Sequence, residues 1–118
     1  NLKIISSESN ETSRRILKKE NINKIKNILI HAVNSGTGKL ARVEGGVVGG
    51  KTGTSFISKD QGYDEDSINA LFVGFIEKNS KRYLLAITVQ EPKNDVSGGS
   101  DVAAPIFSNV FKSIFASS

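Results

Sequence analysis

Gly45-Gly46-Val47-Val48-Gly49-Gly50-Lys51-Thr52-Gly53-Thr54 is the stretch on which the interpretation of this chain depends. Gly45 to Thr52 fits the pattern G-x-x-x-x-G-K-[ST] of a phosphate-binding P-loop. Read forward from Lys51, the same residues give the tripeptide K-T-G. A P-loop lysine lies where a helix begins, because the helix amides must face a phosphate. The K-T-G interpretation instead requires Lys51 on a strand that borders a cleft, so the local structure decides the function.

The residues after Lys51 favour a strand. Gly53-Thr54-Ser55-Phe56-Ile57-Ser58 contains glycine, β-branched and aromatic residues, which are poor helix formers, and the β-branched and aromatic ones form strands well. The segment before the glycines, residues 40–44, is too short and too charged for the buried parallel strand that carries a P-loop. A P-loop nucleotide-binding module remains the alternative.

The composition of the chain argues against several other kinds of site and chemistry. The 118 residues suit one domain, and the chain contains no cysteine and one histidine, His31. Disulfides and thiolate chemistry are therefore ruled out for this chain, and we expect no metal or other cofactor. No apolar run approaches the ~18 residues that cross a bilayer, so any membrane anchor is expected outside this sequence.

Positive charge gathers in the first part of the chain. Residues 1–42 carry nine Lys or Arg and three Glu, whereas every tyrosine and phenylalanine lies beyond residue 50. Nucleic-acid binding by stacking needs aromatic residues among the basic ones. We therefore interpret Lys18, Lys19, Lys24 and Lys26 as a solvated helix face and expect no nucleic-acid partner.

Two amphipathic helices are predicted from apolar residues at spacings of three and four. The first spans about 20–33, with Asn21 as its cap and a left-handed Gly36 at its end. The second spans about 103–115, with Asp101 as its cap and Pro105 in its first turn. His31 is expected to be structural.

The remaining elements are predicted to be strands and loops. Residues 68–77 and 83–90 read as strands joined by a tight polar connection, and therefore as an antiparallel pair. We also expect a short strand at 2–5, a polar loop at 6–13, an extended piece at 14–17 and a surface loop at 58–67. Together with the strand near Lys51, these give an α+β fold, an antiparallel sheet flanked by the two helices.

Five stretches together resemble the C-terminal part of penicillin-binding protein transpeptidases, closest to the monofunctional class that serves cell division or elongation. They are Gly36-Thr37-Gly38-Lys39-Leu40-Ala41, Gly50-Lys51-Thr52-Gly53-Thr54-Ser55, Phe72-Val73-Gly74-Phe75, Glu91-Pro92 and Gly98 to Phe107. K-T-G is a known signature of these enzymes and of β-lactamases. The resemblance extends from about Arg14 to Ala116, with a gap around 58–67. It implies that residues 1–118 are the C-terminal part of a β-lactamase/transpeptidase-like domain.

The departures from the family pattern concern the nucleophile. The family also needs S-x-x-K and S-x-N motifs before K-T-G, yet no serine here precedes a lysine by three positions. Ser67-Ile68-Asn69 spells S-x-N but follows Lys51, so we interpret it as chance. Gly49 stands where the family usually has alanine. The resemblance thus implies that the nucleophile lies outside this chain. This chain cannot acylate by itself.

The resemblance also implies a role for each residue of the strand. Lys51 would be catalytic, holding an ammonium group beside the S-x-N serine, and the backbone N–H of Thr54 would help to form the oxyanion hole. Thr52, Gly53, Thr54 and Ser55 would bind substrate, with the two threonine hydroxyls on its carboxylate.

The expected partners are peptidoglycan stem peptides ending in D-Ala-D-Ala, β-lactams and the rest of the transpeptidase domain. The expected location is the extracytoplasmic face of the cytoplasmic membrane. A serine β-lactamase or β-lactam sensor of the same superfamily is a further alternative.

Overall fold

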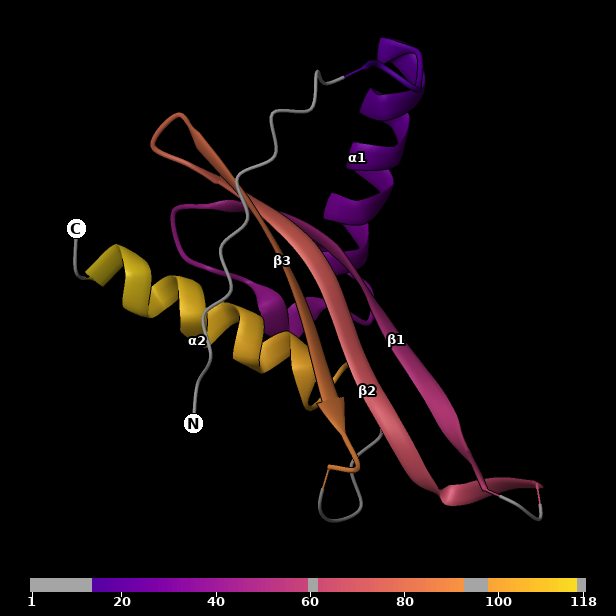
Figure 1. Cartoon of the computed structure of the whole chain (residues 1–118). Helices are drawn as coiled ribbons and strands as arrows, with labels where there is room; N and C mark the ends of the chain where they lie inside the picture. The colour runs from indigo at the N-terminus through magenta and orange to yellow at the C-terminus, as the bar shows by residue number, and fades with distance from the viewer. Residues whose placement is uncertain (1–13, 60–61, 93–97, 117–118) are drawn as a thin grey trace.

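The computed structural model describes residues 14–59, 62–92 and 98–116. Their order is helix, short 3-10 turn, three strands and helix (Figure 1). The elements are α1 (Lys19–Asn34), η1 (Lys39–Ala41), β1 (Val47–Lys59), β2 (Gly62–Lys78), β3 (Lys81–Gln90) and α2 (Ala103–Ala116). The predicted α+β class is confirmed. The strand expected at 2–5 and the loop at 6–13 lie outside the described residues.

The three strands form one antiparallel sheet in the order β1-β2-β3. Asn79 and Ser80 connect β2 to β3 with φ angles of 52° and 61°. Two successive positive φ angles define the type I′ turn, whose twist matches that of the paired strands. The predicted hairpin is therefore confirmed.

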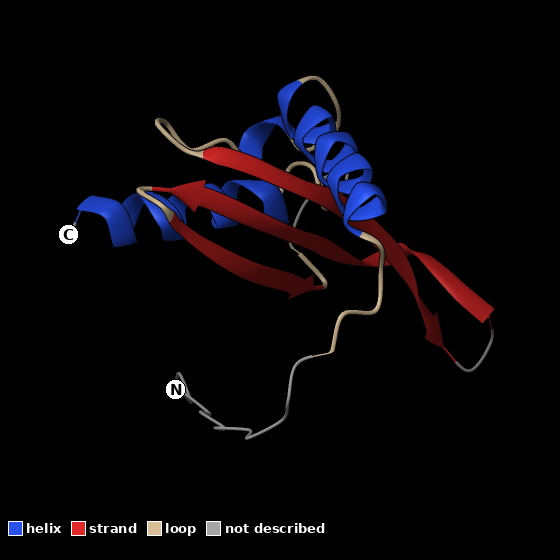
Figure 2. Ribbon diagram, turned by 90° about the horizontal axis from the view of Figure 1, so that it is seen from above, coloured by secondary structure: helices blue, strands red, loops and turns tan. Residues whose placement is uncertain are grey.

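The loop predicted at 58–67 is wrong, because the backbone there continues the β1–β2 ladder. Pairing persists past a register shift between Phe56 and Ile57 and reaches Lys59 opposite Gly62. Paired backbone groups satisfy one another whatever the side chains are, so a polar composition did not prevent strand formation. This end of the hairpin projects beyond both helices (Figure 2).

The sheet has two faces that bury different side chains. A Cβ placed on Gly49 would lie 2.5 Å from the Phe75 ring and 3.2 Å from the Ile30 nitrogen of α1. A Cβ on Gly74, the residue before Phe75 in β2, would lie 2.7 Å from Phe72 and 3.2 Å from Phe107 of α2. Neighbouring residues point to opposite faces, so α1 and α2 lie on opposite sides of the sheet. The absence of a side chain at Gly49 thus lets α1 approach β1 closely.

The main core lies between the sheet and α2. Phe72, Ile76 and Phe107 are fully buried, and the rings of Phe72 and Phe107 meet edge to face at 5.0 Å between centroids. Phe111 extends this row of rings toward Tyr83. Ala70, Phe72 and Ile76 share this face, as the alternation of the sequence predicted.

α1 departs from the prediction at both ends. It begins at Lys19 after Lys18, which makes no side-chain capping bond, so Asn21 lies inside the helix and is not its cap. Gly36 is not in the left-handed region, since positive φ among the described glycines occurs at Gly45 and Gly98. A Cβ on Gly36 would lie 2.8 Å from the Ala32 carbonyl oxygen. Close approach, and not a left-handed turn, therefore favours glycine at that position.

Two further expectations near the helices need correction. Residues 14–17 form no strand, and α2 begins at Ala103, two residues after Asp101, with Pro105 in its first turn as predicted. The start of α2 is held by backbone bonds, such as Ala104 N–H to the Gly99 carbonyl at 2.9 Å.

Candidate active-site strand

Lys51 is the fifth residue of β1, opposite Val73 of β2. Its ammonium group is exposed and donates to the Thr52 carbonyl at 2.8 Å and to Thr52 Oγ1 at 3.3 Å. The strand prediction for Lys51 to Ser55 is confirmed. The P-loop interpretation is wrong, because Lys51 opens no helix and its neighbours are paired in a sheet.

β1 is an edge strand of the described sheet, with β2 on its inner side alone. The Lys51 ammonium group donates to the Thr52 carbonyl, which indicates that this carbonyl points away from β2, toward the free edge. In an antiparallel strand, residues two apart direct their backbone groups to the same side. The N–H and carbonyl of Thr54 therefore face the same free edge, where an extended ligand can add as a strand.

The Thr52 hydroxyl lies in a small cluster of polar side chains. Thr37, from the loop between α1 and η1, places its Oγ1 2.8 Å from Thr52 Oγ1. Ser100 donates to the Thr37 carbonyl at 3.1 Å and so links this loop to the segment before α2. Thr37 is not among the site residues expected from the sequence. No spacing rule predicts its contact with Thr52, because 15 positions separate the two.

Thr54 contacts the segment that leads into α2. Gly99 N–H donates to Thr54 Oγ1 at 3.3 Å, which leaves the hydroxyl proton of Thr54 available to a ligand. Gly98 has φ +104°, and a Cβ there would lie 2.1 Å from Thr54 Oγ1. A Cβ on Gly99 would lie 2.2 Å from the Leu71 carbonyl oxygen. Both positions therefore require glycine if this segment is to reach the strand.

Gly53 and Ser55 complete the strand residues named from the sequence. A Cβ on Gly53 would meet Leu71 at 3.4 Å, an ordinary contact, so the position is open and not crowded. Ser55 is exposed and lies opposite Asn69. The structure thus places Lys51, Thr52, Gly53, Thr54 and Ser55 along the edge strand β1, with Lys51, Thr54 and Ser55 exposed and Thr52 and Gly53 half-buried.

Glu77, near the end of β2, joins α1 to the sheet. Lys26 of α1 donates to its carboxylate at 2.6 and 2.8 Å, and Arg82 of β3 donates at 2.6 Å. These bonds, that of Lys26 first, lower the pKa of Glu77 below its ordinary value. Lys26 is therefore not part of a merely solvated face, although Lys18, Lys19 and Lys24 are exposed as expected.

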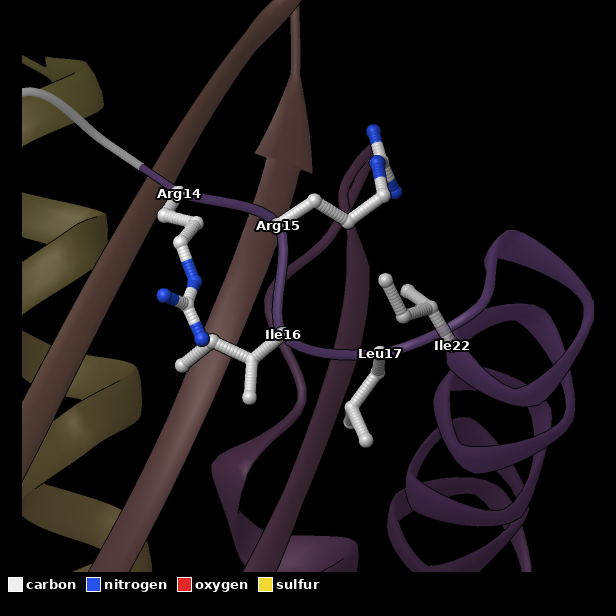
Figure 3. Close-up of a pocket in the computed structure, with 5 residues that line it drawn as sticks. All are labelled: Arg14, Arg15, Ile16, Leu17 and Ile22. Carbon is white, nitrogen blue, oxygen red and sulfur yellow. The ribbon is translucent and has the colours of Figure 1, made fainter.

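The described residues contain no group of three His, Asp or Glu side chains that could hold a metal ion. No helix among them is both long enough and apolar enough to cross a bilayer. A hollow of about 580 Å³ lies near the start of α1, lined by Arg14, Arg15, Ile16, Leu17 and Ile22 (Figure 3). It includes none of the strand residues.

An antiparallel sheet with K-T-G on its edge strand and helices on opposite faces defines a β-lactamase/transpeptidase-like class. The model of the penicillin-binding protein transpeptidase domain matches residues 1–112. This chain therefore belongs to the penicillin-binding protein transpeptidase family.

Individual relatives agree with this assignment. Stage V sporulation protein D of Bacillus subtilis is 34% identical over 110 residues, which are 93% of this chain and 17% of that protein. The transpeptidase domain of Burkholderia pseudomallei penicillin-binding protein 3 superposes with a TM-score of 0.77 at 30% identity, over 90% of this chain and 32% of that one. The transpeptidase domain of the FtsI4 D,D-transpeptidase from Legionella pneumophila gives 0.70 at 35% identity, over 85% and 37%. The chain thus spans a small part of its relatives.

Proposed function

We propose that this chain is the C-terminal portion of a penicillin-binding D,D-transpeptidase that cross-links peptidoglycan stem peptides and binds β-lactams. Its contribution is the K-T-G strand of the active site. One observation carries the proposal: Lys51 to Ser55 are extended along a free sheet edge, with the hydroxyls of Thr37, Thr52 and Thr54 beside it.

The reaction begins outside this chain, on a serine in the preceding part of the domain. Its oxygen attacks the penultimate D-Ala carbonyl of a stem peptide and the peptide bond to the last D-Ala breaks, leaving an acyl-enzyme and free D-Ala. An amine of a neighbouring strand then attacks the ester, and the serine is released as the cross-link forms.

The residues of β1 bind the peptide and the charge that develops on it. The Thr54 N–H donates to the oxyanion, and one such donor is worth about 3 kcal/mol of transition-state stabilisation in other acyl-transfer enzymes. The Thr54 carbonyl accepts from the substrate amide, so the peptide adds to β1 as a strand. The Thr52 and Thr54 hydroxyls donate to the terminal carboxylate.

Lys51 supplies positive charge at the same place. Its ammonium group attracts the carboxylate and assists proton transfer to and from the S-x-N serine of the preceding part. Its present partners, the Thr52 carbonyl and hydroxyl, are exposed, so the side chain can exchange them for a ligand at small cost.

The substrate fixes the proposed location. Peptidoglycan stem peptides are cross-linked outside the cytoplasm, so the complete enzyme acts on the extracytoplasmic face of the cytoplasmic membrane. A β-lactam mimics the D-Ala-D-Ala terminus and is expected to acylate the same serine.

A fluorescent penicillin tests this function on the complete protein. The wild type is expected to label covalently, and Lys51→Ala to lower the second-order labelling rate at least about a hundredfold, as for loss of a group acting in the transition state. Lys112→Ala, which removes an exposed lysine of α2, is the matched control and should label normally. Undiminished labelling of Lys51→Ala would contradict the role of Lys51. Absence of labelling, or rapid release of the label by hydrolysis, would contradict the transpeptidase function.

A further inference from the structure

The C-terminal end of α1 is closed by an arginine from outside the helix. The last carbonyl groups of a helix have no partner within it and need one elsewhere. Arg42, which follows η1, donates from Nε to the Val33 carbonyl at 3.3 Å and from Nη2 to the Asn34 carbonyl. A guanidinium group at this end of a helix also interacts favourably with the helix dipole. Arg42 thus pairs the end of α1 from nine and eight positions further along the chain.

The segment between α1 and Arg42 carries Thr37. Residues 35–41 leave the helix and pass through η1, and the Arg42 side chain ties the end of this segment back to its start. Thr37 Oγ1 lies 2.8 Å from Thr52 Oγ1 of β1. A group that is held in place before a ligand arrives loses less freedom on binding. How firmly the Thr37 hydroxyl is held beside β1 therefore depends on how the ends of residues 35–41 are fixed.

The same segment is also bonded to α2 and to the chain just before it. Ser108 of α2 is 3% exposed and donates its hydroxyl proton to the Arg42 carbonyl at 2.6 Å. Ser100, before α2, donates to the Thr37 carbonyl at 3.1 Å. Breaking the bond of Ser108 would leave a buried polar group without a partner, which is costly. Arg42 therefore connects α1 to α2 around the segment that carries Thr37.

Burial of the neighbouring residues fixes the backbone at Arg42. Ala41 is fully buried and Val43 is 6% exposed, and both belong to the main core. Arg42 itself is exposed, so its guanidinium group reaches the two α1 carbonyls at the surface. Replacing this side chain therefore removes the bonds to α1 and leaves the core contacts of Ala41 and Val43 in place.

We propose that Arg42 is a positioning residue for the carboxylate site on β1. The inference rests on the proposed function. Arg42 acts without touching the ligand: it holds the end of α1, this fixes Thr37, and Thr37 orients the Thr52 hydroxyl that donates to the carboxylate. Its influence is therefore confined to ligands that carry this carboxylate.

Acylation rates of the complete protein by benzylpenicillin and by its methyl ester test this inference. Arg42→Ala is expected to lower the rate for benzylpenicillin about threefold, a part of the effect of one bond between neutral groups. The rate for the ester, which has no charged carboxylate, should change much less. Arg42→Lys keeps a donor for one of the two carbonyls and should restore part of the rate. Lys24→Ala, at an exposed lysine of α1, is the matched control and should react normally.

A double variant shows whether Arg42 acts through Thr37. Effects of two residues that act on the same contact do not add. In a Thr37→Ala background, Arg42→Ala should therefore lower the rate for benzylpenicillin no further. Losses that multiply in the double variant, or an equal loss for the acid and the ester, would overturn the positioning role, because Arg42 would then support the fold in general.

The outcomes separate this inference from the function. A normal rate for Arg42→Ala, in a protein that benzylpenicillin acylates, would overturn the positioning role and leave the function standing. A wild type that benzylpenicillin does not acylate would overturn both. Should Arg42→Ala fail to fold, Arg42→Lys is compared with the wild type instead, with and without Thr37→Ala, and the same outcomes decide.

Discussion

At the scale of single residues, the Thr52 hydroxyl links the strand to the loop after α1. Thr37 Oγ1 and Lys51 Nζ lie 2.8 and 3.3 Å from it. A hydroxyl that already has an oriented neighbour loses less freedom when a carboxylate binds. We therefore expect Thr37 to act as a positioning residue for the proposed carboxylate site.

Thr37→Ala should remove that orientation while keeping the strand. A hydrogen bond between neutral groups is worth about 1 kcal/mol, so the acylation rate of the complete protein by penicillin should fall about fivefold. Thr37→Ser keeps a hydroxyl and should restore most of the rate. Equal rates for the Ala variant and the wild type would remove Thr37 from the site.

Gly98 makes a stricter demand, because its φ of +104° and its closeness to Thr54 both exclude a side chain. Gly98→Ala is expected to destabilise the complete protein by about 1–3 kcal/mol through overpacking and backbone strain. Thermal unfolding measures this. Gly53→Ala, where a Cβ has ordinary contacts, is the control. A larger loss for Gly53→Ala would refute this account of the 98–99 segment.

At the scale of elements, Glu77 joins α1, β2 and β3 through Lys26 and Arg82. Its lowered pKa means that the folded state favours the carboxylate. The stabilisation is therefore present above the ordinary glutamate pKa of about 4.3 and is lost as the pH falls through the lower folded-state value.

Glu77→Gln is expected to lower the melting temperature at pH 7 slightly, since a partly exposed ion pair contributes no more than about 1 kcal/mol. The difference from wild type should shrink as the pH falls below about 4. Glu44→Gln, at an exposed residue that no described Lys or Arg side chain pairs with, should change little at either pH. A deficit of Glu77→Gln that persists in acid would show that charge is not its cause.

How far the sequence predicts these elements depends on the signal that each one carries. The spacing of apolar residues identified α1, α2 and the β2–β3 hairpin, because the residues that face the core recur with the period of the helix or strand. The strand residues beyond Phe56 carry no such pattern in the sequence, although their backbone continues the pairing to Lys59. We expected glycine at position 36 because of a left-handed backbone. The structure explains it by the closeness of the Ala32 carbonyl, which leaves no room for a Cβ. Contacts such as Thr37 with Thr52 depend on tertiary packing and need coordinates.

At the scale of the whole molecule, the described residues leave two surfaces open, and the two differ in chemistry. The free edge of β1 offers backbone groups and hydroxyls, which suit an extended peptide. The face around Val73 and Leu84 instead exposes large apolar side chains. Lys51 lies where the two surfaces meet, which is the place that its proposed roles in binding and catalysis require.

The central claim is that this edge of β1 receives the ligand, and a crystal structure of the complete protein acylated by penicillin tests it most directly. We predict the ligand amide against the Thr54 carbonyl, its former β-lactam carbonyl oxygen toward the Thr54 N–H, and its carboxylate at the hydroxyls of Thr52 and Thr54. An acyl group attached away from β1, with Lys51 to Ser55 free of ligand contacts, would contradict the account.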